Sequence, residues 1–163
     1  MNRNTLALCA VLVALLCTAP GMANAQLDTS RGNSFAARLQ DRPQPLPIER
    51  AFRFYVAEIS PTRYQVSWTL AEDHYLYQHS FRFRLQQGEG SDPVEIPFQL
   101  PEGVAKNDQF FGDIVAYYDE VRAELSLPAP PASGATLLIE YQGCAEWGFC
   151  YPPATAEFTL ISP

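Results

Sequence analysis

Hydrophobic and polar residues alternate in short runs along most of the chain after residue 51. The clearest runs cover residues 52–56, 64–70, 81–85, 121–127, 137–141 and 156–160. This period-two alternation is typical of strands that bury one face and leave the other in water. Pro and Gly residues separate the runs, and no segment carries an apolar stripe of helical period. The pattern predicts an all-β protein, and we favour one immunoglobulin-like antiparallel β-sandwich over residues 45–163.

The N-terminal residues 1–25 have the features of a cleaved secretory signal peptide. An apolar run from Leu6 to Cys17 follows a short basic start, and an Ala-x-Ala cleavage site ends at Ala25. The run is too short for a permanent membrane span, which needs roughly 20 apolar residues. Residues 26–44 show no sustained periodicity and indicate an extended N-terminal arm. We therefore expect an exported protein in an oxidising compartment.

The charge of the chain argues against nucleic acid as a partner. Acidic residues outnumber basic ones by 18 to 11, which gives a formal net charge of −7. Lys106 is the only lysine. Because no basic stripe is available to neutralise phosphate groups, we expect no nucleic-acid binding.

Removal of the signal peptide leaves two cysteines, Cys144 and Cys150. Three interpretations are open: a structural disulfide, a redox pair that cycles between dithiol and disulfide, and a metal site. The spacing differs from the Cys-x-x-Cys of thioredoxin-like sites, and only His74 and His79 could add soft metal ligands. A chain of this length can build a core without a disulfide, which weakens the structural interpretation. The spacing alone still favours a structural disulfide, with the redox pair second.

Two aromatic clusters are further candidates. The segment Asp108-Gln109-Phe110-Phe111-Gly112 predicts a loop whose rings either plug the end of the sandwich or cover a reactive sulfur. The segment from His74 to His79 indicates the start of a strand with packed tyrosines. Isolated histidines are more often satisfied structural residues than catalysts, so neither histidine is assigned a role. The sequence contains no Ser-His-Asp arrangement, phosphate-binding loop or paired-carboxylate signature above background.

Several short motifs together resemble the N-terminal periplasmic domain of the DsbD family of transmembrane thiol:disulfide interchange proteins. The matching segments are Leu46-Pro47, Ala51-Phe52-x-Phe54, Tyr75-Leu76-Tyr77, Leu100-Pro101-x-Gly103, Asp108-x-Phe110-Phe111-Gly112, Ser133-Gly134-Ala135-Thr136-Leu137 and residues 141–153. They follow the family's order over about residues 45–160. The last segment, Tyr-Gln-Gly-Cys-Ala-Glu-Trp-Gly-Phe-Cys-Tyr-Pro-Pro, is long and specific.

The resemblance implies an immunoglobulin-like fold, a periplasmic location and a redox-active Cys144–Cys150 disulfide that needs no metal or cofactor. Cys150 matches the cysteine that attacks a partner's disulfide, and Cys144 matches the cysteine that resolves the mixed disulfide.

The resemblance also implies a set of residues around the cysteines. Phe110 matches the ring of a cap loop that shields the pair, and the implied cap loop comprises Asp108, Phe110, Phe111 and Gly112. Tyr75, Tyr77 and Phe149 match aromatic neighbours of the active site. Two positions depart from the family pattern, because we expect Tyr at position 111 and a small residue in place of Trp147.

The partners implied by the resemblance are thioredoxin-fold proteins of the periplasm. Electrons would come from a DsbD-type thioredoxin-like domain or a membrane electron donor. They would pass to disulfide isomerases and to cytochrome c maturation thioredoxins. The sequence shows no membrane or thioredoxin domain, so we expect either a fragment or a stand-alone version. The alternative is a non-enzymatic secreted immunoglobulin-like binding module with a structural disulfide, and a metal carrier is a third option.

Overall fold

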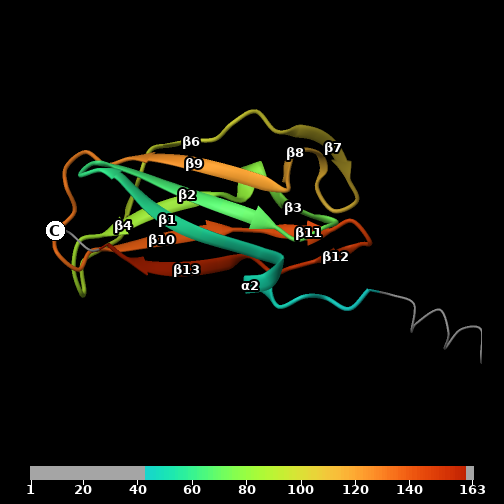
Figure 1. The fold of residues 1–163 in the computed structure, drawn as a ribbon, viewed down its shortest axis with the longest axis horizontal. Helices are drawn as coiled ribbons and strands as arrows, with labels where there is room; N and C mark the ends of the chain where they lie inside the picture. The colour runs from blue at the N-terminus through green and yellow to red at the C-terminus, as the bar shows by residue number, and fades with distance from the viewer. Residues whose placement is uncertain (1–42, 161–163) are drawn as a thin grey trace, which may run out of the picture. The chain divides into compact units, whose positions relative to one another are not determined.

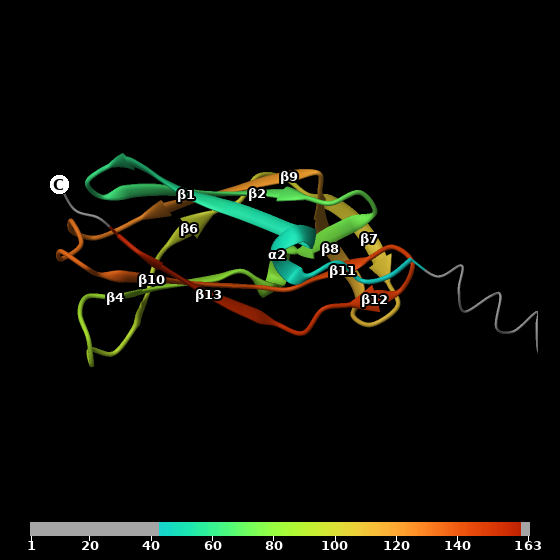
Figure 2. The same ribbon diagram turned by 60° about the horizontal axis from the view of Figure 1, so that its bottom comes forward.

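The computed structural model describes residues 43–160. The predicted signal peptide and residues 26–42 of the predicted arm lie outside this range. Two four-stranded antiparallel sheets face one another as an immunoglobulin-like β-sandwich, as the alternation predicted (Figures 1 and 2). One sheet has the order β1 (Phe52–Ser60), β2 (Arg63–Leu70), β9 (Glu120–Ser126) and β6 (Phe98–Gln99). The other has the order β13 (Ala154–Thr159), β10 (Thr136–Tyr141), β4 (Arg82–Gln86) and β5 (Val94–Glu95).

A third sheet of five strands lies at one end of the sandwich, on the right in Figure 1. Its order is β12 (Phe149–Cys150), β11 (Gly143–Ala145), β3 (His74–Tyr77), β8 (Gly112–Tyr118) and β7 (Val104–Asp108). The described residues also include a short helix, α2 (Ile48–Ala51), and a 3-10 turn, η1 (Gln78–Ser80). Neither is long or apolar enough to cross a membrane.

The central strands of this end sheet continue directly from the sandwich. Strand β3 follows β2 after a three-residue bend, β8 leads into β9 through Asp119, and β11 follows β10 after Gln142. Asp73 and Asp119 adopt positive φ angles of 58° and 55° at two of these bends. Asp tolerates this left-handed conformation better than most residues with a side chain. The sandwich therefore dictates where the end sheet lies.

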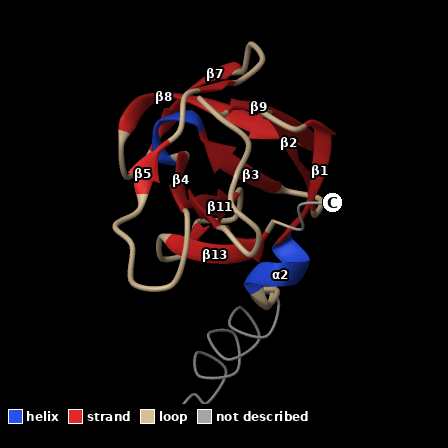
Figure 3. Ribbon diagram, turned by 90° about the vertical axis from the view of Figure 1, so that its left-hand side faces the viewer, coloured by secondary structure: helices blue, strands red, loops and turns tan. Residues whose placement is uncertain are grey.

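The two sandwich sheets face one another (Figure 3), and both contribute residues to the main hydrophobic core. Trp68 is fully buried and contacts the edges of Phe81 and Phe83, with ring centroids 5.0 and 6.2 Å apart. Its indole N–H has no hydrogen-bond partner among the described residues. Leu137 and Ile139 are also fully buried and face the core from β10. Burial of these large apolar side chains stabilises the sandwich.

Candidate active site

Cys144 and Cys150 lie opposite one another on β11 and β12 and form a disulfide. Cys144 is fully buried, whereas Cys150 is partly exposed. The two sulfur atoms therefore differ in their access to solvent, and only Cys150 offers a reagent a direct approach.

Gly143 allows the strand that carries Cys144 to approach its neighbours closely. A Cβ atom at this position would collide with the Tyr75 carbonyl oxygen and would lie 2.7 Å from the Phe52 ring. These distances leave no room for a side chain. The glycine therefore sets the close packing of β11 against β3.

Strand β3 separates the active-site face of the end sheet from the core. Tyr75 and Tyr77 point to the cysteine side, and the Tyr77 hydroxyl lies 2.8 Å from Cys144 Sγ and 3.7 Å from Cys150 Sγ. His74 belongs to the opposite face, because side chains alternate along a strand. It is buried and hydrogen-bonded to the Tyr151 hydroxyl at 3.2 Å and to the Glu72 carbonyl at 2.7 Å. This is the satisfied structural role that we considered for a lone histidine.

Asp108 connects the tyrosines with the loop that follows it. Its carboxylate is buried, and one oxygen accepts hydrogen bonds from the hydroxyls of Tyr75 at 2.6 Å and Tyr77 at 3.1 Å. The other oxygen accepts the backbone N–H groups of Phe110 at 2.8 Å and Phe111 at 3.0 Å. One carboxylate thus fixes both the tyrosine pair and the loop conformation.

This hydrogen bonding changes the proton affinity of the groups beside the sulfur atoms. Burial opposes the charge on Asp108, but the four donors outweigh it and hold its pKa below the usual value. Burial and the nearby Asp108 charge raise the pKa of Tyr77 to about 12. The pKa of Tyr75 is also raised, chiefly by burial and by its hydrogen bond to Asp108. Both tyrosines therefore keep their protons at neutral pH and can donate hydrogen bonds.

The implied cap loop forms the tip of the β7–β8 hairpin. Asp108 and Gly112 are paired across its base, and Gly112 has a φ of 70°, which suits glycine at the end of a three-residue hairpin loop. The Phe111 ring meets the edges of Tyr77 and His79 at centroid distances of 5.0 and 5.1 Å. Phe110 is 55% exposed. Both rings lie at the surface, so they do not plug the sandwich core.

A charged cluster beside the disulfide was not anticipated from the sequence. Lys106 on β7 donates to both carboxylate oxygens of Glu146, at 2.8 and 2.9 Å. The Tyr118 hydroxyl donates to the same carboxylate at 2.7 Å. Burial works against the charge on Glu146, but these donors outweigh it and lower its pKa. The negative charge of Glu146 is thus paired with a cation.

Trp147 and Phe149 flank the tip of the turn between the cysteines. Their rings stack at a centroid distance of 5.6 Å and an interplanar angle of 25°. A hollow of about 310 Å³ separates this turn from the β7–β8 hairpin, which we call the cap hairpin. Trp147, Gln109 and Lys106 contribute to the walls of the hollow. The added ring of Trp147 therefore enlarges the aromatic surface beside the disulfide.

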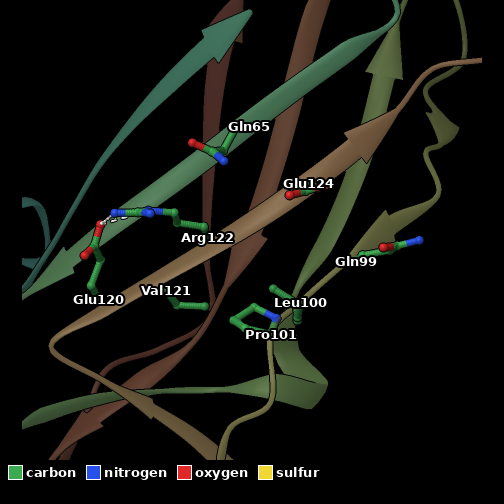
Figure 4. Close-up of a pocket in the computed structure, with 8 residues that line it drawn as sticks. All are labelled: Gln65, Gln99, Leu100, Pro101, Glu120, Val121, Arg122 and Glu124. Carbon is green, nitrogen blue, oxygen red and sulfur yellow. Dashed lines mark hydrogen bonds and ion pairs between the residues drawn. The ribbon is translucent and has the colours of Figure 1, made fainter. Parts of the chain in front are cut away.

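A larger hollow lies elsewhere in the described part of the chain. It has a volume of about 550 Å³ on the outer face of β2 and β9, and charged or amide side chains such as Gln65, Glu120 and Arg122 line much of it (Figure 4). Arg122 pairs with Glu120 there. Within residues 43–160 no group of three or more His, Cys, Asp or Glu residues is placed to hold a metal ion. The polar groups beside the disulfide, Tyr77 and Asp108, lie in the end sheet and not in this hollow.

The comparison with known families agrees with this geometry. A family model described as thiol:disulfide interchange protein DsbD, N-terminal, matches residues 42–162. The chain belongs to this family. DsbD 2 of Pseudomonas aeruginosa is 35% identical over 150 residues, which cover 92% of this chain and 23% of that protein. DsbD of Vibrio cholerae is 34% identical over 151 residues, covering 93% and 24% respectively. The chain thus spans about a quarter of the length of these DsbD relatives.

Solved DsbD structures show the same fold. The reduced DsbD N-terminal domain of Neisseria meningitidis aligns with a TM-score of 0.63 and 28% identity, covering 72% of this chain and 90% of that domain. A second structure, a complex between the DsbD and PilB N-terminal domains of the same organism, gives a TM-score of 0.60 and 27% identity. That match covers 76% of this chain and 92% of the matched one. The second structure shows that a DsbD N-terminal domain forms a complex with another protein's domain.

Proposed function

We propose that this DsbD N-terminal domain is a periplasmic thiol–disulfide oxidoreductase module that relays electrons to oxidised partner proteins. The observation that carries the proposal is the unequal exposure of the disulfide. Cys144 is fully buried beside the Tyr77 hydroxyl, and Cys150 is partly exposed next to surface aromatics. An exchange reaction needs one sulfur that a partner can reach and a second that waits behind it.

The reaction starts from the reduced pair. The Cys150 thiolate attacks one sulfur of the partner's disulfide, so a mixed disulfide forms and the partner's second sulfur leaves as a thiolate. The Cys144 thiolate then attacks Cys150 Sγ, breaks the mixed disulfide and releases the partner's first sulfur as a thiolate. The Cys144–Cys150 disulfide is thereby formed, and the partner has gained two electrons and takes up two protons. A donor dithiol restores the reduced pair by the reverse sequence.

Tyr77 and Asp108 would support the resolving cysteine. The Tyr77 hydroxyl lies 2.8 Å from Cys144 Sγ, so it can donate a hydrogen bond to the thiolate that must form there. Its raised pKa, about 12, keeps the proton on the tyrosine. The same single proton also points to Asp108, 3.1 Å away, so it must turn from the carboxylate to the sulfur when the thiolate forms. The fixed negative charge of Asp108 opposes thiolate formation, which suits a pair that reacts only when a partner is docked.

The β7–β8 hairpin would limit the reaction to suitable partners. Its tip exposes Phe110 and Phe111 at the surface, and Phe111 packs on Tyr77, whose hydroxyl reaches Cys144. Cys150 is only partly exposed, and a partner that displaces the tip would gain fuller access to it than a small oxidant has. Exposed rings also offer apolar contact area to a docking protein. The implied acceptors are thioredoxin-fold proteins such as disulfide isomerases and cytochrome c maturation thioredoxins. A DsbD-type thioredoxin-like domain or a membrane electron donor would restore the reduced pair.

The test is to trap the mixed disulfide with single-cysteine variants. Reduced Cys144→Ser should accumulate a covalent complex with an oxidised disulfide isomerase of the thioredoxin fold, because no resolving thiol remains. Cys150→Ser should form no such complex and is the matched control. Non-reducing gel electrophoresis followed by mass spectrometry detects the product. Absence of any complex with Cys144→Ser, or equal trapping by both variants, contradicts the assigned roles.

The reduction potential separates exchange from a purely structural disulfide. A structural disulfide of a secreted protein has a potential below about −300 mV, and a working pair lies above it. Equilibration of the Cys144–Cys150 pair with glutathione buffers measures the value. A potential above that limit supports exchange. A lower one supports the alternative of a binding module with an inert disulfide.

A further inference from the structure

The β7–β8 hairpin has few backbone attachments to the rest of the molecule on its β7 side. Strand β7 is the outer strand of the end sheet and pairs only with β8. Side chains must therefore hold β7 against the site. Asp108 reaches the tyrosines of β3, and Lys106 reaches Glu146 in the turn between the two cysteines. The Lys106–Glu146 pair joins the cap hairpin directly to the segment that carries the disulfide.

The Lys106–Glu146 pair has a better defined geometry than an ordinary surface ion pair. Both carboxylate oxygens lie within 2.9 Å of Lys106 Nζ, and the two side chains are only 21% and 39% exposed. The Tyr118 hydroxyl holds the same carboxylate, and the ammonium lies 4.6 Å from the centre of the Tyr75 ring. Networks with this partial shielding contribute more than isolated exposed pairs, and salt screens them less.

The exposed pair between Arg63 and Glu124 offers a contrast within the same chain. Its side chains are 57% and 55% exposed, with a single contact of 3.2 Å on the sandwich. It joins two neighbouring strands that are already paired along their whole length. Removal of this pair changes no attachment of the cap hairpin, so it serves as a matched control.

We propose that Lys106 is a positioning residue that fastens the cap hairpin to the turn between the cysteines and so limits access to Cys150. This inference rests on the proposed exchange at Cys150. The cap opens only when the Lys106–Glu146 contact breaks, and a docking partner must break or replace it. Glu146 is the other half of the fastening, while Tyr118 and Tyr75 hold the two charges in place.

An electric-field effect would give a different result. If Lys106 acted only by attracting a thiolate, its neutralisation would slow the reaction of Cys150, and neutralisation of Glu146 would speed it. If the pair instead fastens the hairpin, neutralising either Lys106 or Glu146 should speed the reaction of Cys150, because either change releases the hairpin. The direction of the two effects therefore distinguishes the two explanations.

The experiment measures alkylation of Cys150 by iodoacetamide in the reduced Cys144→Ser protein, where it is the only cysteine of the described region. Rates are taken across pH so that they can be compared per thiolate. Lys106→Met and Glu146→Gln should each react roughly two to five times faster than the parent. The double variant should react no faster than either single one. The charge-reversed pair, Lys106→Glu with Glu146→Lys, should return the rate toward that of the parent.

Arg63→Met should leave the rate unchanged, and thermal unfolding of each variant checks that the sandwich is intact. Opposite effects of Lys106→Met and Glu146→Gln, unchanged rates in both, or additive rates in the double variant would overturn the fastening. These outcomes are independent of the exchange itself. If Cys144→Ser traps a partner but the alkylation rates do not change, only the role of Lys106 fails. If no partner is trapped, the proposed function fails whatever the alkylation rates are.

Discussion

The two buried clusters of this domain differ in the atoms that fill them. The large cluster between the sandwich sheets consists almost wholly of aliphatic and aromatic side chains around Trp68, Phe83 and Leu137. The small cluster in the end sheet contains Tyr75, Tyr77, Ala116 and Cys144, so three of its four side chains carry a hydroxyl or a sulfur. Strand β3 lies between them and is buried on both faces. A single short strand thus serves the stability of the fold with one face and sulfur chemistry with the other.

The difference shows how stability and chemistry are divided. Apolar burial contributes broadly and tolerates many compositions of similar volume. In the end sheet, each polar atom depends on a particular partner, because a buried donor or acceptor that loses its partner is costly. We therefore expect substitutions in the large cluster to change stability first and substitutions in the small cluster to change reactivity first.

The largest expected loss of stability comes from the large cluster. Leu137→Ala removes a fully buried side chain and should lower the free energy of unfolding by about 2–5 kcal/mol. The reduction potential of the Cys144–Cys150 pair should stay the same in the folded fraction, because the end sheet keeps its contacts. Urea denaturation and glutathione equilibration measure the two quantities. A potential that shifts together with stability would show that the clusters are not separate.

A smaller loss of stability, with a local chemical change, is expected from Asp108→Asn. The neutral amide cannot accept all four hydrogen bonds, so the free energy of unfolding should fall by about 1–3 kcal/mol. The pKa of Tyr77, about 12 in the parent, should move down toward its ordinary value because the Asp108 charge helps to raise it. Ultraviolet titration of the tyrosines follows this change, with Tyr77→Phe to identify the signal.

The pH dependence of stability tests whether it is the ionised form of Asp108 that stabilises the fold. The pKa of Asp108 is lowered in the folded protein from an ordinary value of 3.8. Its stabilising effect is therefore fully present above pH about 4 and is lost as the pH falls through the lower folded pKa. The stability difference between parent and Asp108→Asn should be constant from pH 7 to pH 5 and should shrink only at more acidic pH. A difference that disappears between pH 7 and pH 5 would contradict this account of the carboxylate.

The smallest effects on stability are expected at the cap tip. Phe111→Ala removes a ring that packs on Tyr77 and should cost about 1 kcal/mol, whereas Phe110→Ala should change stability by less than about 0.5 kcal/mol. Phe110→Ala should nevertheless speed the oxidation of the reduced pair by small oxidants, since its ring is the one that matches the family's cap. Thiol titration over time measures the rate. Equal rates in parent and Phe110→Ala would remove Phe110 from the shield.

Alternation along the sequence predicts a strand only where one face is wet. The runs behind β1, β2, β4, β9, β10 and β13 satisfied this condition. The structure confirms their bounds to within two residues, except that β1 continues four residues further, to Ser60. Strand β3 is buried on both faces, and β7 is an edge strand whose residues are mostly polar or small. Neither gives a period-two signal. The segment from His74 nevertheless predicted the start of a strand, which β3 confirms, whereas β7 before the predicted Asp108–Gly112 loop was found only in the structure.

The cysteines and the aromatic residues of the site could be recognised in the sequence because they belong to short motifs with fixed spacing. The contact between Lys106 and Glu146 could not be recognised, because 40 residues separate the two partners and both are common surface residue types. A clue was present in the composition, because Lys106 is the only lysine of the chain. The sequence also gave no reason for Trp147, whose ring is now seen to stack on Phe149. Only the fold brings such residues together.

The three-residue bend between β2 and β3 has a consequence for how this site can change. Side chains on β3 alternate between the two clusters. The register of β3 with β8 is fixed by backbone pairing, as is that of β2 with β9. One residue inserted into residues 71–73 would turn Tyr75 and Tyr77 inward and send His74 and Leu76 toward the sulfur atoms. The orientation of the site tyrosines therefore depends on the number of residues between β2 and β3. An insertion of two residues there should preserve that orientation, whereas an insertion of one should reverse it.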